Sequence, residues 1–199
     1  MSQIKYDDTA ARARILQNLP MLDKVQASDI RSLILDVWQE AWRKSDWNDI
    51  TDCPSNPKLA GFPIIRQANS VAEMALAVAS IMSSAYDEFS FDTDLLIAGG
   101  LLLDASKIVE MEPNGDAGGA RFSKLTKVMP HAIYAAHMAL SNNASDDIVN
   151  VILSHTKHVG ATPISVEAVV LHYVDYMVAD CMRFGRGAPL LMMGPTSYG

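Results

Sequence analysis

The feature that most constrains the fold is an apolar run, residues 95–103, that stops at a carboxylate. The run reads Leu-Leu-Ile-Ala-Gly-Gly-Leu-Leu-Leu, and Asp104 and Lys107 follow it. A helix that is apolar on every side has to be buried on every side. Asp92 or Thr93 is a suitable N-cap for such a helix. We therefore expect a buried central helix that runs to Asp104 and beyond, with a charged pair at the mouth of the core.

Apolar residues at helical spacing predict further helices around this central one. We expect them over residues 7–19, 28–44 and 68–86, from Pro130 onward, from 145 to 155, and from 163–165 onward. In the last helix, the spacing predicts an inward face made of Val166, Val169, Val170, Tyr173, Val174 and Met177. Short connections between helices are typical of bundles. The expected fold is therefore all-α, a bundle of six or seven helices.

Two stretches interrupt this helical pattern. Three prolines predict an irregular connection over residues 45–66, and a Pro-Asn-Gly run with a Gly-Gly pair predicts a turn-rich loop or small hairpin at 113–119. We expect residues 1–63 to form an N-terminal helical extension and linker packed on the core. Residues 64–199 would then form the main helical domain, with an irregular C-terminal tail from Gly185.

Composition narrows the classes of partner. The formal net charge is -7, which argues against a nucleic-acid binder because such proteins need a basic surface. The apolar stretches are too short and interrupted to span a bilayer, and the polar N-terminus lacks a signal-peptide core. Two cysteines without metal-site spacing favour reduced thiols. We therefore expect a cytoplasmic protein with a small-molecule substrate and no membrane partner.

The expected helix at 28–44 carries two tryptophans whose place the sequence leaves open. Trp38 and Trp42 recur at helical spacing with apolar neighbours. They could pack into the core, which we favour, or form the surface of a homo-oligomer.

Four polar residues lie in apolar helical surroundings on four successive expected helices. Asp104 ends the central helix, His131 opens the next, His155 ends the one after, and Asp175 lies within the last. Charged groups in apolar surroundings are costly unless they are paired or bind a metal. Four such groups therefore suggest one convergent site.

The order of these residues resembles the His-Asp (HD) superfamily of metal-dependent phosphohydrolases. Residues 100–107, Gly-Leu-Leu-Leu-Asp-Ala-Ser-Lys, are similar to the family's Gly-Leu-Leu-His-Asp-x-Gly-Lys. The start of the helix at His131 resembles its His-Pro-x-x-Gly, and the segments that carry His155 and Asp175 resemble its last His and Asp helices. The resemblance covers about residues 64–183 and implies an HD-like helical bundle, with residues 1–63 as its N-terminal extension.

The resemblance also implies a reduced metal centre. Gln67 and Leu103 stand where the family has two His ligands, so its first metal site is expected to be empty. The residues that match the second site are Asp104, His131 and His155. Such a two-His-one-carboxylate set suits one Fe(II), Mn(II) or Zn(II) ion. Hydrolysis of a phosphate ester then becomes less expected than chemistry on a weakly charged substrate, such as an aromatic or carbonyl-bearing compound.

The remaining site residues are assigned expected roles around this set. Lys107 would face a substrate anion or form an ion pair with Asp104 or Asp175, and Asp175 would act as a base or orient another group. We also expect Asp104, Lys107, His131, His155 and Asp175 to be catalytic, and four residues to contact the substrate: Gln67, Leu103, Glu110 and Tyr173.

Three functions remain open from the sequence. The first is a single-metal hydrolase or lyase, in which the ion activates water or polarises a carbonyl. The second is a metal-free enzyme that uses the same side chains as general acids and bases. The third is a catalytically inactive module that binds a ligand or regulates, or an interaction protein that uses the Trp38 and Trp42 helix as its contact face.

Overall fold

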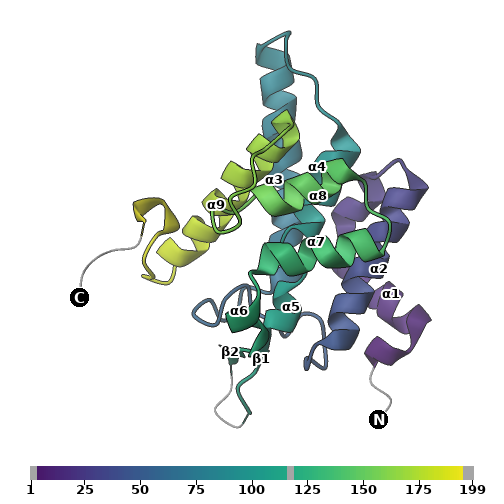
Figure 1. Ribbon diagram of the computed structural model, residues 1–199, viewed down its shortest axis with the longest axis vertical. Helices are drawn as coiled ribbons and strands as arrows, with labels where there is room; N and C mark the ends of the chain where they lie inside the picture. Colours follow the sequence, from purple (N-terminus) through teal and green to yellow (C-terminus); the bar gives the residue numbers. More distant parts are fainter. Residues whose placement is uncertain (1–3, 116–118, 195–199) are drawn as a thin grey trace.

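The computed structural model describes residues 4–115 and 119–194, and its fold is all-α, as predicted (Figure 1). Among these residues, seven α-helices have nine residues or more, in line with the six or seven expected. They are α1 (Asp8–Asn18), α2 (Ser28–Lys44), α3 (Ile64–Ala85), α4 (Thr93–Leu102), α7 (His131–Ser141), α8 (Asp146–Ser154) and α9 (Val166–Phe184). Shorter elements are α5 (Lys107–Glu110), α6 (Leu125–Val128), η1 (Ile4–Tyr6), η2 (Pro20–Lys24), η4 (Leu191–Met193), β1 (Met111–Pro113) and β2 (Ala120–Phe122).

Helix α4 is the buried centre of the fold. The Asp92 carboxylate accepts hydrogen bonds from the backbone N–H groups of Asp94 and Leu95, so the predicted N-cap is confirmed. Every residue from Leu95 to Leu102 is buried. Gly100 allows α3 to pack at backbone distance, since a Cβ on Gly100 would lie 2.6 Å from the Cα of Ala72.

The central helix ends earlier than predicted. It stops at Leu102, and the chain then turns tightly through residues 103–106 before α5 begins. The backbone N–H of Ala105 bonds to Leu102, and that of Lys107 bonds to Asp104, both over three residues rather than four. The prediction of a helix continuing through Asp104 is therefore wrong, and Asp104 lies in a tight turn with its side chain fully buried.

The N-terminal helices share the hydrophobic core of the rest of the chain. The Trp38 indole N–H donates to the carbonyl of Leu101 at 2.8 Å, and both Trp38 and Trp42 are fully buried. The Asp94 carboxylate accepts from the backbone N–H groups of Gln26 and Ala27, just before α2 begins. These contacts place both tryptophans in the core, so the alternative of an exposed Trp38 and Trp42 contact face is wrong.

The two predicted interruptions are both present. Residues 45–63 form an irregular connection, in which the Trp47 indole N–H donates to the carbonyl of Met111 at 2.9 Å. Strands β1 and β2 pair antiparallel, with Met111 opposite Phe122, and form the small hairpin expected near 113–119, part of whose turn lies outside the described residues. In Figure 1 this hairpin lies at the lower end of the molecule, below α5 and α6.

Helix α9 packs along α3 and α4, but with a different face from the one predicted. Its buried residues are Glu167, Ala168, Leu171, Val174, Asp175 and Val178. Val166, Val169, Tyr173 and Met177 are exposed, so their predicted inward orientation is wrong. Helix α9 has apolar residues on both sides, and polar anchors decide which side is buried. Glu167 accepts the backbone N–H of Asp92, and Asp175 faces the site.

Within the described residues, none of the helices is both long and apolar enough to cross a membrane.

The close contact at Gly100 gives a stability test. We expect Gly100→Ala to lower the free energy of unfolding by about 2 kcal/mol, because α3 backbone atoms occupy the space of the new methyl group. Gly185→Ala is the matched control, since its Cβ would meet neighbours only at 3.6 Å. Urea unfolding measures both variants, and a Gly100→Ala protein as stable as the wild type would contradict the packing.

Candidate metal centre

Three side chains from separate elements meet at one point. The Asp104 carboxylate comes from the turn between α4 and α5, His131 from the first residue of α7, and His155 from the end of α8. Asp104 Oδ1 lies 3.4 Å from His131 Nε2 and 3.6 Å from His155 Nε2. The two Nε2 atoms are 3.0 Å apart. The predicted convergence of these three residues is therefore present.

Neighbouring backbone groups hold both histidines in place. Pro130 precedes α7, as predicted, and the Ser106 hydroxyl donates to the carbonyl of His131 at 2.8 Å. His155 Nδ1 lies 2.6 Å from the carbonyl of Ile152, which requires a proton on Nδ1. In a neutral His155 the lone pair is then on Nε2, facing Asp104. A metal-ligating histidine usually donates a hydrogen bond from its other ring N–H to a carbonyl or carboxylate, as His155 does here.

The spacing of the three ligand atoms fits one metal ion. Ligands about 2.1 Å from an ion lie about 3.0–3.6 Å apart when the angles between them at the ion are about 90–120°. The observed separations are 3.0, 3.4 and 3.6 Å. Asp104 Oδ1 is also buried without a hydrogen-bond donor, which is costly for a carboxylate oxygen unless a cation is bound. This buried group could therefore hold a metal ion.

The charges around Asp104 favour its ionised form. Burial alone would raise the pKa of the Asp104 carboxyl, but Lys107 and the two histidines hold it well below its usual range. Burial and the charge of Lys107 lower the pKa of His131 to about 3, so its imidazole is neutral at pH 7. Burial would also lower the pKa of His155, but the proximity of Asp104 outweighs burial and raises it. A metal ion would displace that proton from His155.

Lys107 and Gln67 contact the second oxygen of Asp104. Lys107 Nζ lies 2.6 Å from Asp104 Oδ2, so Lys107 forms the ion pair that was one of its two expected roles. The Gln67 amide donates from Nε2 to Asp104 Oδ2 at 3.3 Å and to Asp175 Oδ1 at 3.2 Å. Gln67 thus joins the two carboxylates, although the sequence predicted that it contacts substrate.

The site opens into a cavity of about 300 Å³. Five predicted site residues line it: Lys107, Glu110, His131, His155 and Asp175. The structure adds lining residues that the sequence analysis missed, among them Tyr176, Arg183, Thr156 and Phe122. Arg183 lies seven residues after Tyr176, so these two share a face of α9. Tyr176 directly follows Asp175, and the helical period alone would not have placed the two side chains together.

Three predicted substrate contacts are not among the residues that line this cavity, and one of them is Gln67, described above. Leu103 is fully buried in the hydrophobic core and is not among the residues that line this cavity. Tyr173 is 70% exposed and lines a different hollow beside His172. Leu103 was expected at the cavity because it stands where the family has a His ligand, and Tyr173 because it was predicted to face inward from the last helix. The tight turn at 103–106 and the observed rotation of α9 place these side chains on other faces.

Glu110 has an unusual environment in the cavity. Its side chain is only 4% exposed, and Oε1 is buried without a hydrogen-bond partner. Burial, opposed by the charge of Lys107 and assisted by that of Asp104, raises the pKa of the Glu110 carboxyl to about 7. The sequence predicted that Glu110 contacts the substrate, and the structure places Glu110 in the wall of the cavity.

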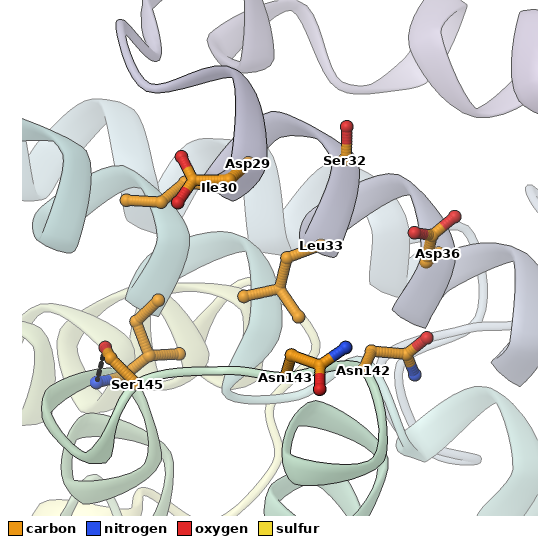
Figure 2. Close-up of a pocket in the computed structure, with 9 residues that line it drawn as sticks. Asp29, Ile30, Ser32, Leu33, Asp36, Asn142, Asn143 and Ser145 are labelled. Carbon is orange, nitrogen blue, oxygen red and sulfur yellow. Dashed lines mark hydrogen bonds between the residues drawn. The ribbon is translucent and has the colours of Figure 1, made fainter.

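A larger hollow of about 420 Å³ lies between α2 and the connection from α7 to α8 (Figure 2). Its two carboxylates, Asp29 and Asp36, are two helical turns and about 10 Å apart along α2, so they do not converge. Asp36 is paired with Arg12, and the Ser145 hydroxyl accepts the N–H of Ile148 (dashed line in Figure 2). The smaller cavity, which holds the converging polar groups, is therefore the candidate site.

Comparisons with protein-family models, curated proteins and solved structures gave no match for this chain. The HD-like interpretation therefore stays a prediction, and the site has to be judged by its geometry.

The bridge at Gln67 predicts a measurable role in stability. Gln67→Leu leaves two buried carboxylates without a shared donor, and we expect it to cost about 2 kcal/mol of the free energy of unfolding. The matched control is Gln39→Leu, because buried Gln39 donates to Asp8, which is exposed and can be solvated instead. Urea unfolding at pH 7 compares the two, and an equal or smaller loss for Gln67→Leu would contradict the bridge.

The raised pKa of Glu110 predicts a pH-dependent cost. Between about pH 4.5 and 7 the unfolded chain releases the Glu110 proton while the folded chain keeps it, so this residue lowers stability as pH rises. The loss is on the order of 2–3 kcal/mol and is complete above about pH 7. We expect Glu110→Gln to be more stable than the wild type at pH 8 and similar at pH 4.5. Urea unfolding at both pH values tests this, and equal wild-type and variant stability at pH 8 would refute it.

Proposed function

We propose that this chain is a small-molecule hydrolase or lyase on a divergent HD-type scaffold. It would use one divalent metal ion, Zn(II), Mn(II) or Fe(II), held by Asp104, His131 and His155. The observation that carries this proposal is the buried Asp104 Oδ1, which makes no hydrogen bond of normal geometry and lies at metal-ligand spacing from two imidazole nitrogens.

The cavity supplies further groups for the reaction. A divalent ion held there would lower the pKa of a bound water and polarise a substrate carbonyl. Lys107 neutralises the Asp104 oxygen that faces away from the histidines. Asp175 lines the cavity, and Gln67 holds its Oδ1 in place. Burial and the charge of Asp104 raise the pKa of Asp175, as suits a group that accepts and returns a proton.

The arrangement of charges supports a weakly charged substrate. Between Asp104 and Asp175 lies the neutral Gln67 amide, in the place where the family resemblance would put a first metal ion. Lys107 is already paired with Asp104 and so offers less of its charge to a substrate anion. Neutral esters, amides and other carbonyl compounds therefore fit the site better than phosphate esters.

Metal content is the first test of this proposal. Protein purified without a chelator or a nickel column should contain about one equivalent of a transition metal by elemental analysis. We expect Asp104→Asn and His155→Ala to lose most of it, because each removes one ligand of the set. His137→Ala, an exposed histidine on α7, is the matched control. Full metal content in His155→Ala would rule out this site.

Turnover separates the three functions. We expect 4-nitrophenyl acetate, a neutral ester, to be hydrolysed in preference to bis(4-nitrophenyl) phosphate, with loss of activity on chelation and in His155→Ala. Activity that resists a chelator but is lost in His155→Ala and Asp175→Asn would favour the metal-free acid–base enzyme. Metal binding without turnover of either ester, or of any neutral carbonyl compound tried, would favour the inactive binding module.

A further inference from the structure

Glu110 presents an unused carboxyl to the cavity on a rigid backbone. Its N–H donates to the carbonyl of Ser106, and its own carbonyl accepts the N–H of Ser123 at 2.7 Å and the hydroxyl of Thr126 at 3.0 Å. The main chain is thus fully bonded, while side-chain Oε1 is buried without a donor. A buried acceptor that the protein does not satisfy, in a cavity, is a site for a donor on a ligand.

The cations near this carboxyl are engaged elsewhere. Lys107 Nζ lies 2.6 Å from Asp104, and the Arg183 guanidinium donates to the carbonyl of Pro189 at 2.9 Å. The rest of the cavity wall around Glu110 includes large apolar or aromatic side chains: Met111, Phe122, Tyr176 and Leu191. A carboxyl in such surroundings binds a donor more strongly than one in water.

We propose that Glu110 recognises N–H groups of the substrate, and that the substrate is a flat amidine, guanidine or amide rather than an anion. This assignment rests on the proposed function, because it takes the same cavity as the substrate site. A planar pair of N–H groups matches the two oxygens of a carboxylate. The same carboxylate repels an anionic ligand and so also excludes competitors.

The protonation of Glu110 is compatible with an amidine, guanidine or amide as the ligand. Its pKa near 7 means that an amidinium can ionise it on binding, whereas an amide can bind either form. Glu110 lines the same cavity as His131 and Asp175. N–H groups bound by Glu110 would therefore lie in the cavity that contains the proposed reacting groups.

Benzamidine and benzoate test the proposal, because they share a shape and differ in charge. Binding is measured by titration calorimetry with metal-loaded wild-type protein, Glu110→Gln, and Glu112→Gln as the matched control. Glu112 lies two residues away and pairs with Arg121 outside the cavity. We expect wild type and Glu112→Gln to bind benzamidine equally. Glu110→Gln should bind it at least tenfold more weakly, while it keeps its metal and unfolds cooperatively at a temperature at least as high as that of the wild type.

Benzoate is titrated in the presence of a chelator, so that a metal cannot hold its carboxylate. Tighter binding of benzoate than of benzamidine to wild type, or equal benzamidine affinity in wild type and Glu110→Gln, would overturn the assignment. The two proposals fail separately. Protein that takes up no metal but binds benzamidine through Glu110 contradicts only the metal centre. Metal-loaded protein whose benzamidine affinity is unchanged in Glu110→Gln contradicts only this inference.

Discussion

The structure depends on the burial of one ionised carboxylate at the end of its most apolar helix. Asp104 is fully buried, and a bare carboxylate there would be prohibitively unfavourable. Lys107 from the next turn neutralises the charge of this carboxylate, and the Gln67 amide from α3 donates a hydrogen bond to it. Asp104 also brings His131 and His155 together from α7 and α8. The packing of these helices and the assembly of the site therefore depend on each other. A shift of any of these helices would leave the charge of Asp104 uncompensated.

Sequence patterns predicted the helices and the cluster of polar residues well. They predicted the rotation of α9 about its axis and the roles of single side chains less well. Capping at Asp92 and the proline before His131 are local signals, and both hold in the structure. The inward face of α9 was mispredicted because apolar residues occupy both sides, so nonlocal contacts of Glu167 and Asp175 decide the rotation. Gln67 and Leu103 were both expected at the substrate. Only three-dimensional packing shows that one joins two carboxylates and the other fills the core.

The site contains groups that stability alone would not favour. Asp175 and Glu110 are buried carboxyls whose pKa values are raised, and each would be replaced at less cost by a neutral or apolar side chain. Glu110 also lacks any partner for one of its oxygens. Buried groups that cost stability and converge on one cavity mark a candidate functional site, and they support the function proposed above.

The bond from the Ser106 hydroxyl to the carbonyl of His131 has a consequence for how this scaffold can diversify. It ties the end of the central turn to the start of α7, at 2.8 Å, across the whole segment between them. That segment contains the β1–β2 hairpin and α6, which supply Phe122 and Thr126 to the cavity wall. The relative positions of the candidate ligands Asp104 and His131 therefore do not depend on the hairpin. Loops of other lengths and sequences could be exchanged there to change the cavity wall, while these two side chains stay in place.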